Sequence, residues 1–308
     1  MATARESIAR GSKSFSAASM LFDRETRARA WLLYAWCRRC DDIADGQDHG
    51  HGMTRVADPQ ARLDEIRTGT EAALDGRVVG DPAFDSLRLV AAECAIPREW
   101  PRDLVRGFEL DAQGWRPVTE DDLLRYCYHV AGAVGLMMAA VMGVATDDEA
   151  TLDRACDLGL AFQLANIARD LREDAEAGRC YLPRQWLDEA GLTPDTLLLP
   201  ENRATLAGLG ERLAALAERY EASARGGTAV LPFRSAWAVL AAAGIYGDIA
   251  REVGRRGEAA LDRRVSTGAA AKLGWIARAA VQAAARVRYA GEPRPADLWT
   301  RPRAKLRI

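Results

Sequence analysis

Histidine is scarce in this chain of 308 residues, which contains only three. His49 and His51 lie in a glycine-rich segment, and His129 has no glutamate three residues before it. A di-iron helical bundle needs two Glu-x-x-His pairs, so the sequence excludes that class of metal centre. We interpret His129 as a histidine of the hydrophobic core.

Long hydrophobic runs are also lacking. The longest uncharged apolar run, residues 130–145, is shorter than the roughly 20 residues that span a bilayer and contains Gly132, Gly135 and Gly143. It predicts a buried core helix whose glycines permit close approach of a neighbouring helix or a ligand. Residues 1–16 have no apolar segment after their charges, so we expect an untargeted, cytoplasmic protein.

The charges are balanced, and the cysteines show no pairing pattern. A net charge of −2 gives no general electrostatic case for binding nucleic acid. The six cysteines are scattered through helical sequence, which is typical of a reducing compartment. Cys37 and Cys40 form one isolated C-x-x-C motif, which argues against zinc binding and thioredoxin-type chemistry. The basic residues near the C-terminus are typical of a frayed end: Arg301, Arg303, Lys305 and Arg307.

No segment alternates polar and apolar residues over the length of a strand, whereas helix start and stop signals recur along the chain. We predict an all-α fold and a single helical domain over residues 1–308, with its core at 10–290 and an extended basic tail at 291–308. The predicted helices span residues 23–45, 58–76, 81–95, 101–114, 119–143, 147–177, 184–190, 202–224, 234–254 and 267–287.

Two acidic clusters, at residues 41–45 and 166–174, lie within this helical sequence. Residues four apart share a helix face, so each cluster stacks polar side chains. The stacked residues are Asp41 and Asp45 in the first cluster, and Asn166, Asp170 and Asp174 in the second. Unpaired carboxylates on half-buried helices are costly, so we expect a cation between them. Sparse oxygen ligands, completed by water and substrate phosphates, are typical of Mg²⁺. The clusters lie about 125 residues apart, so one domain must bring their helices face to face.

Arginines flank both acidic clusters, and their guanidinium groups match phosphate oxygens bidentately. They are Arg38 and Arg39 at the first cluster, and Arg169, Arg172 and Arg179 at the second. Carboxylates and arginines together predict a site for a diphosphate-bearing substrate, whose departing diphosphate leaves a carbocation.

Aromatic side chains on the same helices suit a polyprenyl chain and could stabilise a cation by about 0.5–2 kcal/mol each. Tyr34 and Phe162 are the strongest candidates, because they lie on the helices that carry the carboxylates. The full set is Phe15, Tyr34, Tyr126, Tyr128, Phe162 and Tyr246.

Several motifs occur together along the chain. They are Ser-Lys-Ser-Phe at 12–15, Tyr-Ala-Trp-Cys-Arg at 34–38 before the first cluster, Tyr-Cys-Tyr-His-Val-Ala-Gly at 126–132, Gln163 before the second cluster, and Gly-Arg-Cys-Tyr-Leu-Pro at 178–183. The chain thereby resembles the squalene/phytoene synthase family, most closely its bacterial phytoene synthases. The resemblance covers nearly the whole chain and continues more weakly to residues 295–299.

This resemblance implies the all-α isoprenoid synthase fold and a prenyltransferase of carotenoid biosynthesis. The implied reaction is Mg²⁺-dependent, with Mn²⁺ as a substitute, and joins two geranylgeranyl diphosphates head to head. It passes through prephytoene diphosphate to phytoene, needs no reductant, and ends in a proton loss whose acceptor is either the released diphosphate or a tyrosine.

Roles for individual residues also follow from the resemblance. The implied metal ligands are Asp41, Asp45, Asn166, Asp170 and Asp174. The implied catalytic residues are Tyr34, Arg38, Tyr126, Gln163, Arg169 and Tyr246. The implied substrate-binding residues are Ser14, Phe15, Arg38, Val130, Phe162, Gln163, Asn166, Arg179 and Tyr181. The sequence departs from the family pattern at Gly11, where several relatives have histidine, and at Ala168, where leucine is common.

Three alternatives stay open. A squalene or dehydrosqualene synthase would use farnesyl diphosphate, and the sequence does not place the pocket-floor side chains that decide chain length. A head-to-tail elongase fits Asp-Asp-x-x-Asp at 41–45 but usually repeats that motif, whereas Arg169 precedes Asp170 here. A non-catalytic assembly protein would have lost carboxylates that are intact in this chain.

Amphiphilic substrates and a hydrocarbon product are compatible with peripheral contact at the inner face of the cell membrane. The basic tail and apolar helix faces point weakly in that direction. Contacts with downstream carotenoid enzymes are compatible with the same setting.

Overall fold

The structure is a computed structural model that describes residues 18–45 and 58–303. Within these two ranges the regular structure is helical and contains no strand, which confirms the all-α prediction. The α-helices are α3 (Arg24–Asp45), α4 (Pro59–Leu74), α5 (Pro82–Glu93), α6 (Glu99–Ala112), α7 (Glu120–Cys127), α8 (Ala133–Val141), α9 (Glu149–Glu176), α10 (Arg184–Ala190), α11 (Arg203–Arg225), α12 (Phe233–Arg256) and α13 (Ala269–Ala284). The shorter helices are η1 (Tyr128–Gly132), η2 (Pro200–Asn202), η3 (Gly226–Val230), η4 (Gly257–Leu261) and η5 (Arg286–Tyr289).

Local capping signals fix where many helices begin. The side chains of Asp58 and Asp81 accept backbone hydrogen bonds ahead of a proline in the first turn of α4 and α5. Asp23 caps α3 and Asp148 caps α9 by accepting backbone hydrogen bonds in the same way, without a proline. Thr119 forms the predicted capping box of α7. Predicted and observed boundaries therefore agree to within a few residues.

One long predicted helix, residues 119–143, is interrupted. Residues 128–132 form the π-helical turn η1 between α7 and α8, so the prediction of one regular helix is wrong in this detail. The backbones of this segment and of α9 are in contact, because a Cβ atom on Gly159 would lie 2.7 Å from the carbonyl carbon of Ala131. A Cβ atom on Gly135 would collide with the carbonyl group of Ala155 in the same way. The glycines thus allow close helix packing, as predicted.

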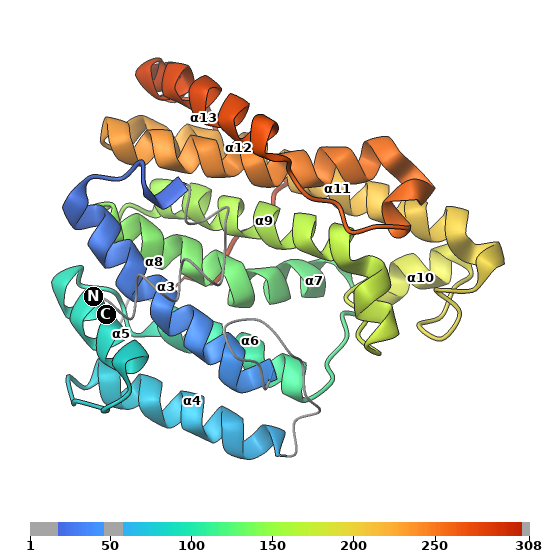
Figure 1. The fold of residues 1–308 in the computed structure, drawn as a ribbon, viewed down its shortest axis with the longest axis horizontal. Helices are drawn as coiled ribbons and strands as arrows, with labels where there is room; N and C mark the ends of the chain where they lie inside the picture. The colour runs from blue at the N-terminus through green and yellow to red at the C-terminus, as the bar shows by residue number, and fades with distance from the viewer. Residues whose placement is uncertain (1–17, 46–57, 304–308) are drawn as a thin grey trace.

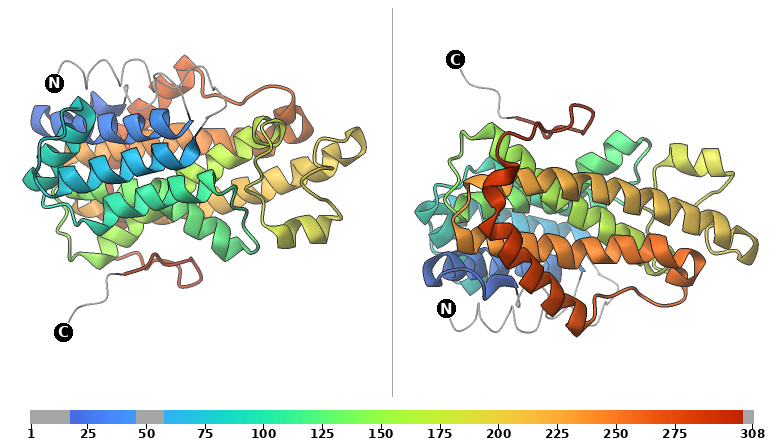
Figure 2. Two further views of the ribbon diagram at one scale, coloured as in Figure 1. Left: turned by 90° about the horizontal axis from the view of Figure 1, so that it is seen from below. Right: turned by 90° about the horizontal axis from the view of Figure 1, so that it is seen from above.

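Helix α9 runs through the centre of the molecule (Figure 1) and packs against α8, η1, α11 and α12. Helices α3 to α6 form a group on one side of it, while α12 and α13 cover the other side (Figures 1 and 2). The buried side chains form one continuous hydrophobic cluster. The helix bearing the first acidic cluster and the helix bearing the second therefore belong to one packed core.

Among the described residues, the segment Glu120–Val141 is long and apolar enough to cross a membrane by length and composition. Most of it is buried inside the protein, as in the core helix of a soluble domain. This agrees with the prediction of a core helix at residues 130–145.

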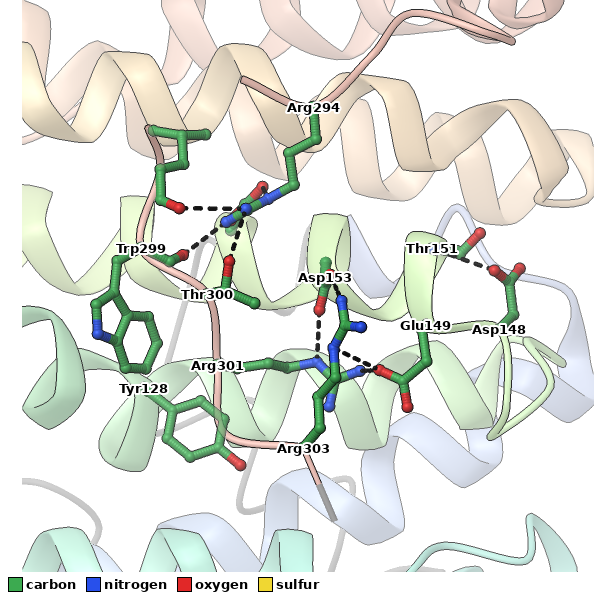
Figure 3. A network of polar contacts seen from close by, with 12 residues as sticks. Tyr128, Asp148, Glu149, Thr151, Asp153, Arg294, Trp299, Thr300, Arg301 and Arg303 are labelled. Carbon is green, nitrogen blue, oxygen red and sulfur yellow. Dashed lines mark hydrogen bonds and ion pairs between the residues drawn. The ribbon is translucent and has the colours of Figure 1, made fainter. Parts of the chain in front are cut away.

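The C-terminal tail packs along α9 up to Arg303, the last described residue (Figure 3). Arg301 is only 4% exposed and forms ion pairs with Glu149 and Asp153 of α9. Arg303 also pairs with Asp153, at 2.8 Å. The expectation of a frayed end is therefore wrong for the described part of the tail, because acidic residues of α9 bind its arginines. Lys305 and Arg307 lie outside the described residues.

Candidate active site

A cavity of about 330 Å³ lies between α9, α12, η1 with α8, and the residues that precede α3. Its lining is mostly apolar, and α9 contributes residues from Thr151 to Asn166. At a rise of 1.5 Å per residue, this stretch of helix measures about 22 Å. The cavity therefore has the elongated, apolar character needed for a prenyl chain.

The second acidic cluster begins in the cavity and continues beyond it. Asn166 lines the cavity, and its buried amide oxygen Oδ1 has no hydrogen-bond partner. Asp170 and Asp174 follow one and two turns later on α9. The predicted stacking of these three side chains therefore leads from the apolar cavity to a carboxylate pair.

Two arginines neutralise Asp170. Arg169 donates hydrogen bonds of 2.7 and 2.5 Å to its two carboxylate oxygens, and Arg264 donates bonds of 2.8 and 2.9 Å. Burial alone would raise the pKa of Asp170, but these hydrogen bonds hold the pKa below its usual value. Asp170 is thus ionised and fully paired.

Asp174 is in the opposite situation. Burial, followed by the negative charge of Asp170, raises the pKa of Asp174 to about 7, although the nearby Arg179 opposes the shift. A divalent cation at this point would lower the pKa again by favouring the ionised form. The donor set of Asn166, Asp170 and Asp174 consists of hard oxygen atoms, and one of them is buried without a partner. These residues fit a Mg²⁺-type ion.

The first acidic cluster is anchored by Arg38, which donates a hydrogen bond of 2.6 Å to Asp42. Asp41 is 46% exposed and lies 4.0 Å from the same guanidinium group. The side chain of Asp45 lies outside the described part of the chain. Burial raises the pKa of Tyr34, which precedes Arg38 by one turn, to about 12. The Tyr34 phenol therefore stays protonated near neutral pH.

The predicted substrate-binding and catalytic residues divide into three groups. Val130, Phe162, Gln163, Asn166 and Tyr246 line the cavity. Tyr34, Arg38, Tyr126, Arg169, Arg179 and Tyr181 are not among its lining residues. Ser14 and Phe15, like Gly11 of the family pattern, lie outside the described residues, while Ala168 is buried in the core.

Aromatic stacking organises both the cavity and its surroundings. Phe162 and Tyr246 stack at a centroid distance of 4.3 Å on the cavity wall. Tyr126 and Tyr181 stack at 4.9 Å outside the cavity, and both donate hydrogen bonds to Asp111. Because Tyr181 is two residues from Arg179, these contacts help to fix the segment that carries Arg179.

Three further predicted contributors are also absent from the cavity lining and have contacts of their own. Tyr128 is buried, donates a hydrogen bond of 2.5 Å to Asp103, and packs on Trp299 of the tail. Arg39 pairs with Asp81, and Arg172 with Glu176. Tyr128 is therefore not part of the cavity wall, whereas the places of Arg39 and Arg172 at the diphosphate site stay predictions.

Sequence reasoning also missed two residues. Arg264 follows η4 in an irregular segment, and Asp111 lies at the end of α6. Neither lies within or beside one of the two acidic clusters. Arg264 is 94 positions from Asp170 in the sequence, yet it binds this residue. Only the packing of the helices brings them to the site. Within the described residues, no three carboxylate, histidine or cysteine side chains group closely enough to hold a metal ion by themselves.

Residues 8–270 match the family model described as squalene/phytoene synthase. The chain belongs to the squalene/phytoene synthase family. It is 48% identical to the phytoene synthase of Pseudescherichia vulneris, over 97% of both chains. It is also 48% identical to the 15-cis-phytoene synthase of Pantoea ananas, over 96% of both. These likenesses confirm the prediction of a prenyltransferase with phytoene synthase function over the farnesyl-using alternative.

Solved structures support the predicted isoprenoid synthase fold. A dehydrosqualene synthase crystallised in complex with a ligand superposes with a TM-score of 0.81 at 27% identity, covering 92% of this chain and 96% of the other. The squalene synthase HpnC from Alicyclobacillus acidocaldarius gives a TM-score of 0.70 at 25% identity, covering 82% and 92%. The family and the fold are those of enzymes that use prenyl diphosphates and generally depend on divalent metals.

Proposed function

We propose that this chain joins two molecules of geranylgeranyl diphosphate head to head, through prephytoene diphosphate, to phytoene, with Mg²⁺ as its cofactor. The observation that carries the proposal is the line formed by Asn166, Asp170 and Asp174, which begins in the apolar cavity and ends in a carboxylate of raised pKa. The phytoene synthase relatives, which match nearly the whole chain, support the choice of substrate.

The residues that would hold Mg²⁺ are Asp41 and Asp45 on α3 and Asn166, Asp170 and Asp174 on α9. When bound, the ion supplies Lewis-acid stabilisation of the departing diphosphate oxygens, with Mn²⁺ as a substitute. Guanidinium groups beside these carboxylates add bidentate donors for phosphate oxygens. They belong to Arg38, Arg169, Arg179 and Arg264.

The cavity wall protects and stabilises the cation that remains after diphosphate leaves. Val130 and the neighbouring apolar side chains exclude water, which would otherwise capture the cation as an alcohol. The stacked rings of Phe162 and Tyr246 offer aromatic faces that stabilise positive charge by about 0.5–2 kcal/mol. Gln163 is a polar side chain beside them on α9.

The final step removes a proton from the cationic precursor of phytoene. Burial raises the pKa of Tyr34 to about 12, and it also raises the pKa of Tyr126 and Tyr181. These phenols remain protonated at neutral pH, so none of them is a ready base. Of the two candidate acceptors, released diphosphate is therefore favoured. No reductant enters the reaction.

Product analysis tests this proposal directly. Purified protein with Mg²⁺ is incubated with geranylgeranyl diphosphate or with farnesyl diphosphate, each with and without NADPH. We expect phytoene from the first substrate without reductant. A thirty-carbon product made in preference would place the enzyme on the squalene side, and the absence of any product with intact, folded protein would contradict catalysis. Chelation by EDTA followed by return of Mg²⁺ should abolish and restore turnover.

We further propose that the enzyme works in the cytoplasm at the inner face of the cell membrane, where downstream carotenoid enzymes would receive its product. The described tail arginines pair with α9, so the support lies elsewhere, on α13 at the edge of the molecule (Figure 2). Leu273 and Val281 are 68% and 72% exposed there, and α13 carries Lys272 and Arg278 but no acidic residue. We expect the wild-type protein to bind anionic vesicles and Leu273→Asp to lose that binding. Equal binding by the variant would oppose this location.

A further inference from the structure

An arginine lies at the end of the cavity farthest along α9 from Asn166. Arg154 lines the cavity there, together with Thr151 of α9 and Gly227 and Thr228 of η3. Arg154 is partly buried, and a charged group beside an apolar pocket is costly unless hydrogen bonds satisfy it. The contacts of Arg154 therefore decide whether it can move out of the way of a substrate.

The Arg154 side chain is fixed by acceptors from two different segments. Its Nη1 atom donates a hydrogen bond of 2.6 Å to the carbonyl oxygen of Ser223 at the end of α11. Its Nη2 atom donates to the carbonyl oxygen of Glu292 in the C-terminal tail. A Cβ atom on Gly227 would lie 2.8 Å from the Cβ atom of Arg154, so the glycine lets η3 pack closely on this residue. Arg154 is thus held between η3 and the tail.

A second set of contacts ties the tail to the same part of α9. The Ser223 hydroxyl donates a 2.5 Å hydrogen bond to Asp157, whose side chain is 1% exposed. Arg294 of the tail binds both carboxylate oxygens of Asp157, at 2.7 and 2.8 Å. Arg294 also donates a hydrogen bond to the carbonyl oxygen of Trp299 (Figure 3). This bond stabilises the bend of the tail between the two residues. The tail is therefore bonded to Arg154 directly and, through Asp157, to its partner Ser223.

We propose that Arg154 sets the depth of the prenyl cavity, and so the longest prenyl chain accepted, and that the C-terminal tail holds Arg154 in place. A chain laid along α9 from Asn166 meets a guanidinium that is held by carbonyl oxygens of two different segments. Arg154 is the specificity-determining residue, whereas Asp157 and Arg294 are positioning residues. This inference rests on the proposed function, because it assigns the cavity to the prenyl chain.

The test compares chain lengths by binding as well as by turnover. Thiolodiphosphate analogues with 15, 20 and 25 carbons, which resist ionisation, are titrated into the full-length protein in the presence of Mg²⁺. Arg154→Ala and Arg154→Met should each increase the affinity for the 25-carbon analogue relative to the 20-carbon analogue by about tenfold. Arg294→Ala should change the ratio in the same direction but less. Arg154→Lys, which keeps a donor at this position, should lie closer to the wild type.

Arg303→Ala is the matched control, because Arg303 also pairs with α9 but bonds neither Arg154 nor Ser223. Its ratio of affinities for the 25-carbon and 20-carbon analogues should equal that of the wild type. If Arg154→Ala does not fold by circular dichroism, Arg154→Met and Arg294→Ala decide the question. Folded variants that weaken both analogues equally, leaving the ratio unchanged, overturn the proposal. Turnover of geranylgeranyl diphosphate by the wild type is scored separately, so failure of the proposed function is distinguishable from failure of this inference.

Discussion

The raised pKa of Asp174 predicts that this carboxylate destabilises the metal-free protein at neutral and higher pH. Burial and the charge of Asp170 raise the pKa from 3.8 to about 7. Between those two values the unfolded carboxylate is ionised while the folded one is protonated, so stability falls as pH rises from about 4 to 7 and the loss is constant above pH 7. Replacing Asp174 by asparagine removes this loss, because the amide is neutral throughout.

The magnitude follows from the size of the shift. About three pKa units at 1.36 kcal/mol each give an upper limit near 4 kcal/mol. Since Asp174 is only half-buried, solvent screening reduces the expected gain to about 1–2 kcal/mol at pH 8. For a chain of this length, that corresponds to a rise in melting temperature of about 2–3 °C.

Thermal unfolding followed by circular dichroism in EDTA, at pH 8 and pH 5, measures this effect. Asp174→Asn should melt above the wild type at pH 8, and less than half of the difference should remain at pH 5. Glu218→Gln is the control for net charge, since Glu218 is exposed on α11 and is not among the groups that shift the pKa of Asp174. Mg²⁺ should stabilise the wild type more than Asp174→Asn. A variant that melts at or below the wild-type temperature in EDTA at pH 8 would refute the desolvation argument.

Three further substitutions test other parts of the site. Asp41→Ala should lower turnover more than about 100-fold by removing a metal ligand, with helix content by circular dichroism unchanged; a near-native rate would contradict the metal assignment. Gly159→Ala should destabilise the fold by about 1–3 kcal/mol in denaturant titration, because the added methyl group collides with Ala131, and a neutral effect would mean that the two backbones can separate freely. Phe162→Ala should reduce turnover about 2–30-fold through loss of the aromatic face beside Tyr246, while Phe162→Tyr should keep most of the rate; equal losses in both would point to packing instead.

The sequence by itself determined the helices and the alignment of the metal-site residues. Caps such as Asp58 and Thr119 act on backbone groups two or three residues away, so their effect is visible in a short stretch of sequence. The stacking of Asn166, Asp170 and Asp174 follows from helix geometry alone. The combined motifs were also sufficient to predict the family and its fold.

The tertiary structure alone decided which charged side chains meet. Arg39 and Arg172 share the sequence neighbourhood of the acidic clusters but face other carboxylates. Arg264 has no local motif, yet it binds Asp170. A guanidinium group lies where its helix and the packed neighbours place it, and the periodicity of one helix carries no information about the helix opposite.

The same reason explains the tail and the floor of the cavity. Arg294 is 137 positions from Asp157, and Arg154 is 138 positions from Glu292. Burial of Asp157 makes a paired arginine necessary, but composition does not say which arginine supplies the charge. The order of the helices in space brings the tail across α9, and that arrangement places Glu292 beside Arg154 and Arg294 beside Asp157.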